Sequence, residues 1–386
     1  MASHPYRLSC GRITIRYGSP SAKPQILWDN GSLVSALSTP IWYDELMPEA
    51  CEALSLLFEK DVDAGYGAAD CFFGSFTRIW DTLLSQKKIP QAIEHWIGVL
   101  QRVRDWETRS NKTVHKGTPY CFLGATYIFA GDYDLGLRYL YDAIEEDKRT
   151  SATLGRTDSY KGAPAYMLAS LVDDPRNFLY QPVVFPARKR IEGFLDTYRG
   201  KSGSSMQMAG FGRKFLQETS LEFQKLYFVY VLLEIIKHES AWNSATPNDF
   251  ANMKNRDVLF DLCLVIDGVL RERFPPASFI SYGIYNLCNS KGWLNTGDRN
   301  PSDLNGNLNP MITGRPPPSP QLVVPALLDL TLRYRGSPVR LEMSWLLLAW
   351  HLRNYAAHEL IPQQVLVQRY EEIVQALMNA LFISVE

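Results

Sequence analysis

The sequence predicts an all-α protein, and two observations support that fold class. Strand-like runs rich in β-branched residues are sparse: Arg12–Arg16 and Gln181–Phe185 have such content. The second run contains Pro182, which cannot donate a ladder hydrogen bond. Apolar residues in the second half of the chain recur at helical spacing over long segments. We therefore expect helices throughout, with a short strand near the start.

The length of the chain indicates more than one domain. Its 386 residues suffice for about two or three domains at ~150 residues each. The composition turns to small polar residues at Gly200–Ser205, which suggests a linker or a flexible loop. We therefore place the boundary there. Residues 1–200 are expected to form a helical region that binds a regulator or partner, and residues 206–386 a helical domain.

Residues 120–143 predict two antiparallel helices that approach each other closely. Gly124 and Gly136 leave room for that approach, while Tyr127 and Leu140 fill the space between the helices. The spacing resembles a tetratricopeptide repeat. The residues of the pattern are Tyr120, Leu123, Gly124, Tyr127, Gly131, Asp132, Tyr133, Gly136, Tyr139, Leu140 and Ala143.

A weaker copy of this hairpin is expected before it, with a turn at Lys87–Pro90. The copies are unevenly spaced, so residues 106–117 would be an inserted loop. Segments 162–172 and 187–199 could form a further hairpin. The alternative is that no true repeat exists, because any helical hairpin needs small residues where its helices touch. The weaker copy consists of Phe76, Ile79 and Leu83, followed by Ala92, Trp96 and Val99.

The C-terminal half predicts a bundle of helices. A polar, proline-rich loop at 292–320 interrupts it and is longer than a compact bundle normally uses. The loop is either a flexible surface insertion or a segment that meets a ligand through its asparagines and arginines. The expected helices are Glu218–Ser240, Asn252–Arg273, Ser278–Ser290, Gln321–Arg333, one beginning at Pro338, and Gln363–Leu381.

The composition is that of an ordinary globular protein. With 46% hydrophobic residues, 21% charged residues and a net charge of −1, the chain has no global attraction to nucleic acid, so any such site must be local. The six cysteines form no C-x-x-C pair and have no zinc-ligand spacing, which predicts buried free thiols without a bound metal or cofactor. Neither a signal peptide nor a membrane span is evident. We expect a cytoplasmic protein without a membrane partner.

The candidate site is the segment Arg353–His358, which follows an apolar helical stretch. Residues of a regular helix advance by about 100° each, so Asn354 and His358 share a face, whereas Arg353 and His358 diverge by about 140°. Asn354 can hydrogen-bond the imidazole and fix its tautomer. To join them, either the arginine side chain must swing round or the helix must distort near its end. A position near the helix C-terminus favours the protonated imidazole.

These residue types suit the cleavage of RNA without a metal. One group removes the proton of the 2′-hydroxyl, another protonates the leaving 5′-oxygen, and cationic donors stabilise the developing charge. A single histidine does not easily serve as both acid and base. A second copy across a two-fold interface would complete the site, so the motif predicts a homodimer.

The segment Arg353-Asn354-x-x-Ala357-His358, late in a helical C-terminal domain, resembles the R-x4-6-H signature of the HEPN superfamily. The resemblance covers residues 206–386 by architecture, but only these six residues carry it in sequence. It implies a metal-independent endoribonuclease with Arg353 and His358 as catalytic residues, Asn354 as a supporting residue and RNA as substrate. It also implies a toxin, antiviral-defence or CRISPR-linked setting.

Regulation would then lie in the N-terminal region, through a protein or a nucleotide-type regulator. The N-terminal region lacks the alternating strand and helix pattern that a Rossmann-like sensor domain would require, so we do not expect such a domain there. His351 lies one heptad before His358 and could line the same groove as a second supporting residue, or it could be a buried, hydrogen-bonded histidine.

Simpler interpretations remain open. Arg353 could pair with Glu342 or Glu359 while His358 caps the last carbonyls of the helix. The protein would then be a non-catalytic dimeric scaffold. Asp267 interrupts an apolar run and needs a partner if it is buried, either Arg271 or an arginine of another helix. His238 and Glu239 would form a solvent-exposed helix end.

Overall fold

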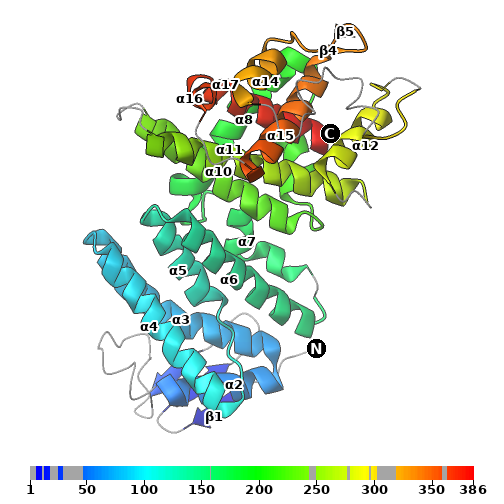
Figure 1. The fold of residues 1–386 in the computed structure, drawn as a ribbon. Coiled ribbons are helices and arrows are strands. Elements are labelled where there is room, and N and C mark those ends of the chain that lie inside the picture. The colour runs from blue at the N-terminus through cyan, green and yellow to red at the C-terminus, as the bar shows by residue number, and fades with distance from the viewer. Residues whose placement is uncertain are drawn as a thin grey trace. The chain divides into compact units, whose positions relative to one another are not determined.

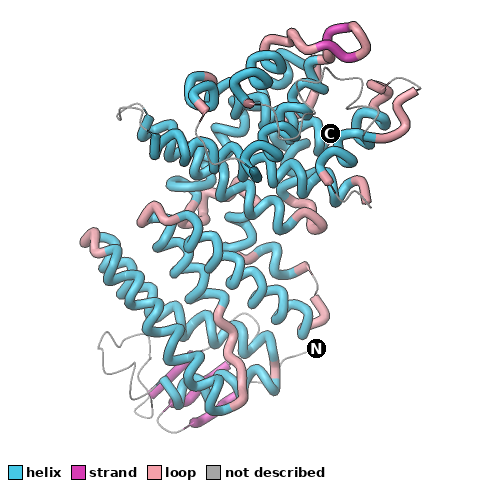
Figure 2. Tube along the Cα trace, in the orientation of Figure 1, coloured by secondary structure: helices cyan, strands magenta, loops and turns pink. Residues whose placement is uncertain are grey.

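The computed structural model divides the chain into two compact units, Met1–Leu168 and Ala169–Glu386, and both are mainly helical (Figures 1 and 2). The predicted all-α class is confirmed. Side chains of residues 1–46, 240–252 and 358–362, and of Ser75, lie outside the description. The structure describes residues 6–10, 13–17, 25–28, 47–156, 158–242, 249–275, 279–294, 297–301, 319–358 and 363–386.

The strand expected near the start is present within a small antiparallel sheet. Strands β1 (Tyr6–Cys10), β2 (Ile13–Tyr17) and β3 (Gln25–Trp28) pair in chain order, with Leu8 opposite Ile15 and Ile15 opposite Ile26. The other strand-like run, which contains Pro182, is not a strand. Residues Tyr180–Val184 form a π-helical turn, η3, that leads into α8 (Phe185–Ser202).

The helices of the N-terminal unit follow one another through short connections. The predicted turn between α5 and α6 is confirmed: Gly131 has φ +78°, and the Asp132 side chain accepts a hydrogen bond from the Leu135 amide, which caps α6. The elements are α2 (Met47–Lys60), α3 (Val62–Ser85), α4 (Ile89–Ser110), α5 (Gly117–Phe129), α6 (Tyr133–Thr153), the 3₁₀ turn η2 (Ser159–Gly162) and α7 (Pro164–Ala169).

Helices α5 and α6 touch at the predicted pair of glycines. A Cβ added to Gly124 would lie 2.7 Å from the Gly136 carbonyl oxygen, and one added to Gly136 would lie 3.0 Å from the Gly124 oxygen. Leu140 is fully buried beside Gly124, as expected. Tyr127 is half-buried instead and stacks on Tyr139, with ring centroids 5.6 Å apart. The close helical hairpin is therefore confirmed, whereas membership of a repeat family stays a prediction.

The weaker hairpin is also present, as α3 and α4, but the expected inserted loop is shorter. Helix α4 continues to Ser110, so only residues 111–116 connect it to α5. This connection is partly buried, because Val114 is fully enclosed and His115 Nε2 lies 2.9 Å from the Asp147 carboxylate. It is a packed part of the unit rather than a surface insertion.

The C-terminal unit contains the expected bundle, in which α11, α15 and α17 pack on one another. Helix α14 ends before the predicted Arg333, because a short β4–β5 hairpin begins there. The elements after α8 are α9 (Met208–Phe211), the π-helical turn η4 (Gly212–Leu216), α10 (Glu222–Trp242), α11 (Asp249–Arg273), α12 (Ile280–Ser290), α14 (Pro320–Leu328), β4 (Arg333–Tyr334), β5 (Ser337–Pro338), α15 (Leu341–His358), α16 (Gln364–Gln368) and α17 (Tyr370–Val385).

The segment Gly200–Ser205 is not the boundary between the units. Helix α8 continues through Ser202, and Gly203 ends it with φ +71°, a left-handed conformation that glycine adopts readily. The Ser204 hydroxyl then donates to a Glu386 carboxylate oxygen at 2.6 Å. The small polar residues are therefore a helix cap inside the C-terminal unit, and the division falls between Leu168 and Ala169.

The described part of the 292–320 loop is held by a buried carboxylate. Asp298 is 5% exposed and accepts hydrogen bonds from the Tyr334 hydroxyl and, at 2.5 Å, from Arg335 Nη2. Residues 302–318, which include three of the asparagines and Arg315, lie outside the description. The loop is thus fixed to the β4–β5 hairpin near its start.

Two further expectations concern the chain as a whole. Cys51, Cys121, Cys263 and Cys288 are buried free thiols, whereas Cys71 is half-buried and Cys10 lies outside the described side chains. Among the described helices, none is long and apolar enough to cross a membrane.

Candidate functional site

The predicted motif occupies the last turns of α15. The residues that precede it, Leu346–Ala349, are fully buried, which fixes the helix in the bundle. Arg353 and Asn354 are half-buried, and the helix continues without a break to His358. The segment therefore lies where a buried helix reaches the surface of the C-terminal unit.

Arg353 is held by a neighbouring helix. Its side chain is 27% exposed, and its Nε lies 3.6 Å from Oδ2 of Asp267 on α11. Its Nη1 donates to the Asn354 side-chain oxygen at 3.4 Å, which places the guanidinium beside the residue expected to orient the imidazole. Of its alternative partners, Glu342 pairs with Arg340 instead, and Glu359 lies outside the described residues.

Asp267 has both of the partners that its burial led us to expect. Its side chain is 5% exposed and accepts two hydrogen bonds from Arg271, at 2.8 and 2.7 Å. With Arg353 at 3.6 Å, two guanidinium groups share one carboxylate. This cluster of three residues carries one positive charge in excess, at a place where both arginine side chains reach solvent.

His351 is enclosed in the bundle rather than placed along a groove. It is 3% exposed and stacks on Tyr355 with ring centroids 6.4 Å apart. Burial lowers its pKa to about 4, so the imidazole is neutral at pH 7. Its Nε2 has no hydrogen-bond partner among the described residues. The burial agrees with the alternative of an interior histidine, but the hydrogen bond expected with that alternative is not made at Nε2.

His358 is the last residue of α15, and its side chain lies outside the description. The structure thus brings Arg353 and Asn354 together, one turn of helix before His358. The described residues contain no group of three or more histidine, cysteine, aspartate or glutamate side chains able to hold a metal ion. Asp257 pairs with Arg256, and Asp261 accepts from the Tyr227 hydroxyl at 2.5 Å.

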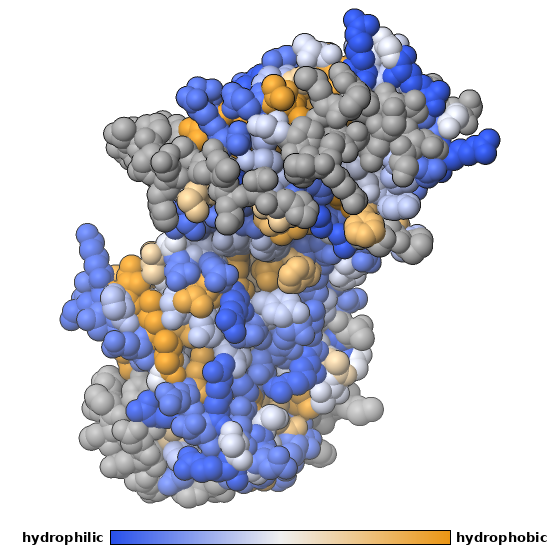
Figure 3. Space-filling model, viewed as in Figure 1, coloured by the Kyte–Doolittle hydropathy of each residue, from blue (hydrophilic) through white to orange (hydrophobic). Residues whose placement is uncertain are grey.

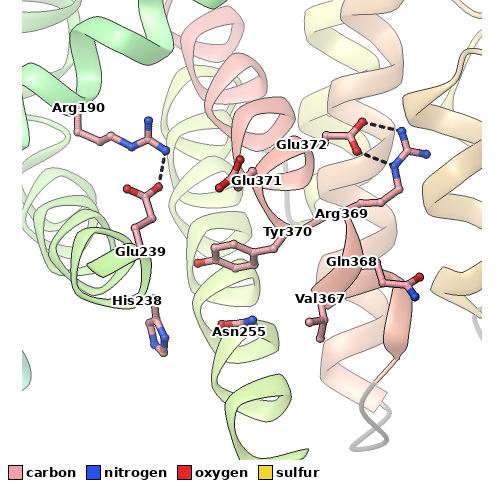
Figure 4. Close-up of a pocket in the computed structure, with 10 residues that line it drawn as sticks. All are labelled: Arg190, His238, Glu239, Asn255, Val367, Gln368, Arg369, Tyr370, Glu371 and Glu372. Atoms are coloured by element: carbon pink, nitrogen blue, oxygen red, sulfur yellow. Dashed lines mark hydrogen bonds and ion pairs between the residues drawn. The ribbon is translucent and has the colours of Figure 1, made fainter. Parts of the chain in front are cut away.

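A second feature was not expected from the sequence. A cavity of about 550 Å³ lies in the C-terminal unit, lined by parts of α8, α10, α11, α16 and α17 (Figure 4). His238 and Glu239, expected at a solvent-exposed helix end, line this cavity and are only partly exposed. Arg190 of α8 donates a hydrogen bond to Glu239. These two residues are therefore only partly exposed, because α8 packs on α10 and its Arg190 pairs with Glu239.

The N-terminal unit has a smaller groove, of about 210 Å³, over α4, α5 and α6. Apolar side chains line part of it, including Ile97, Leu100 and Leu123, and Ile97 is 39% exposed. Figure 3 shows hydrophobic surface in this area of the unit. Arg104 and Tyr139 supply polar groups at the same groove.

The chain matches no family model, no curated protein and no solved structure in the comparisons made with them.

Proposed function

We propose that the chain is a metal-independent endoribonuclease of HEPN type that cleaves single-stranded RNA. The observation that carries the proposal is the position of Arg353. It is partly exposed at the end of α15, adjoins Asn354, and belongs to a cluster with one excess positive charge. A phosphodiester supplies the negative charge that such a cluster lacks, and a guanidinium fits its paired oxygens.

The proposed reaction is a transesterification. An imidazole takes the proton of the 2′-hydroxyl as the 2′-oxygen bonds to phosphorus, and the bond from phosphorus to the 5′-oxygen breaks. A second, protonated imidazole gives its proton to the leaving oxygen. Arg353 stabilises the charge that develops on the phosphoryl oxygens. The products are a 2′,3′-cyclic phosphate and a 5′-hydroxyl.

The two imidazoles come from two copies of His358 in a homodimer. One copy acts as base and the other, favoured in its protonated form by the helix C-terminus, acts as acid. The apolar groove of the N-terminal unit is a place where a protein or nucleotide-type regulator can bind. A toxin, antiviral-defence or CRISPR-linked role fits a nuclease controlled in this way.

A second function, that of a non-catalytic dimeric scaffold, is favoured by a different observation. Arg353 contributes to neutralising the buried Asp267, and His351 is a neutral interior residue, so both have structural roles without catalysis. An inactive helical bundle would retain the same contacts.

The test is cleavage of a generic single-stranded RNA by the purified full chain in EDTA. The proposal predicts cleavage with 2′,3′-cyclic phosphate ends, and a loss of at least ~10²-fold in Arg353→Met and His358→Gln. Arg340→Met, which changes an exposed arginine before the same helix, is the matched control and should keep full activity.

Three results would contradict the nuclease. These are activity that survives in Arg353→Met or His358→Gln, complete dependence on an added metal, and no cleavage by a folded homodimer. The last result, with the dimer verified by light scattering, would support the scaffold.

A further inference from the structure

The cavity of the C-terminal unit contains buried polar groups that are not hydrogen-bonded. Asn255 of α11 is fully buried, and within the described part of the chain neither its amide nitrogen nor its amide oxygen has a partner. Tyr370 is 8% exposed, and its buried hydroxyl likewise has no hydrogen-bond partner there. Both residues line the cavity. Unpaired buried polar groups destabilise a protein, so such groups at a cavity wall indicate a ligand that would pair with them.

These groups come from different helices and converge on one region. Figure 4 shows the Tyr370 hydroxyl directed toward the side of the cavity that carries Glu239, and Asn255 lines the same cavity from α11. Burial is the main cause of the raised pKa of Tyr370, and the Glu239 charge contributes to it. Tyr370 therefore keeps its proton at neutral pH and can donate a hydrogen bond as well as accept one.

The charges of the lining do not suit an anion. Both guanidinium groups of the described lining are in ion pairs, Arg190 with Glu239 and Arg369 with Asp329 and Glu372. The buried Nε of Arg190 has no hydrogen-bond partner there, so it is a further donor that a ligand's acceptor can pair with. Burial lowers the pKa of His238, so its imidazole is neutral at pH 7. Glu371 is a third carboxylate of the lining, beside Glu239 and Glu372. A phosphate or carboxylate group would meet negative charge here.

We propose that this cavity binds a small, uncharged molecule with an amide-like edge, in which a hydrogen-bond acceptor lies beside a donor. The Asn255 side chain requires both, because its NH₂ group needs an acceptor and its carbonyl needs a donor. A planar amide pairs with such an edge through two hydrogen bonds, as asparagine does with adenine. A polyamine offers donors alone and would leave the amide nitrogen unpaired.

The size and the wall of the cavity agree with this class of ligand. A volume of about 550 Å³ lies within the range of small-molecule sites. Val367 and the Tyr370 ring supply apolar contact. Because the unpaired atoms of Asn255 and Tyr370 are closed to solvent, binding includes a side-chain shift at the wall. The inference does not depend on nuclease activity.

The experiment is calorimetric titration of the full chain with four probes: adenosine, nicotinamide, adenosine 5′-monophosphate and spermidine. Adenosine or nicotinamide should bind with a Kd below about 1 mM, and the monophosphate about tenfold or more weakly than adenosine. Asn255→Leu should weaken binding at least about tenfold while raising the melting temperature of the free protein, since it removes an unpaired amide.

Tyr370→Phe tests the same site independently, and it should also weaken binding. If Asn255→Leu does not fold, the affinity of Tyr370→Phe is the deciding measurement. Asn289→Leu, at an exposed asparagine of α12, is the control and should leave both affinity and melting temperature unchanged. Failure of both neutral probes to bind would overturn the proposal. Unchanged affinity in Asn255→Leu and Tyr370→Phe, or tighter binding of spermidine or the monophosphate, would do so equally.

Discussion

The buried carboxylate of Asp267 leads to a quantitative prediction about its two arginines. Arg271→Met removes two charge-assisted hydrogen bonds, but its side chain is 40% exposed, so solvent screening limits the expected loss to about 1–2 kcal/mol. Arg353→Met removes an ion pair at 3.6 Å, beyond hydrogen-bond range, at a cost of about 0.5–1 kcal/mol. Methionine keeps much of the apolar stem in each case.

The double variant should lose more than the sum of the single variants. With neither arginine present, the 5% exposed carboxylate has no compensating cation among its described partners, and breaking a buried pair in this way costs about 3–5 kcal/mol. The excess over additivity is then about 1–2 kcal/mol. Adding Asp267→Asn to the double variant should recover most of the loss, because it removes the charge.

Urea unfolding of the full chain, followed by tryptophan fluorescence, measures these free energies. The two units can unfold separately, so the comparison uses the transition that the variants shift. Losses that add within about 0.5 kcal/mol would refute shared neutralisation. So would a triple variant no more stable than the double one.

Two further predictions concern stability. Gly124→Ala should destabilise the N-terminal unit by about 1–3 kcal/mol, because its Cβ would lie 2.7 Å from a backbone oxygen of Gly136. Gly200→Ala is the control: nothing lies within 4 Å of the new Cβ, so this change should be neutral or stabilise by about 0.5–1 kcal/mol. A melting temperature of Gly124→Ala no lower than that of Gly200→Ala would contradict this account. Burial lowers the pKa of His351 from 6.5 to about 4, so the unfolded chain takes up a proton first and stability falls as the pH drops through this window. Between pH 7.5 and 5 the parent protein should lose about 2 kcal/mol of its free energy of unfolding through His351, and His351→Leu should not show this loss. Urea midpoints of the variant with the same pH dependence as those of the parent would disprove the prediction.

Much of the fold could be predicted because its signals are local. Helical periodicity located α10, α11, α12 and α15 within a few residues, and the glycine pair Gly124 and Gly136 identified a close helix contact. The errors arose where one local signal has two structural uses. Gly200–Ser205 has the composition of a linker, yet α8 continues through Ser202 and Gly203 ends it with φ +71°.

The part of the candidate site that could be predicted is the contact that a buried charge requires. A carboxylate inside an apolar run must be neutralised, so an arginine partner for Asp267 followed from the sequence. Which other helix would supply the second arginine did not follow, because that depends on how α11 and α15 pack. The cavity had no sequence signal, since Asn255 and Tyr370 are unremarkable residues on separate helices until the bundle brings them together.

The buried cysteines give each unit its own chemical reporter. Cys51 and Cys121 lie in the N-terminal unit, Cys263 and Cys288 in the C-terminal one, and burial raises the pKa of all four thiols far from neutrality. A thiolate-selective alkylating reagent therefore reaches these sulfurs only when the surrounding helices open. Half-buried Cys71 is the described thiol most accessible to labelling in the folded state. Mass spectrometry of the labelled peptides would time the opening of the two units separately, without an engineered probe.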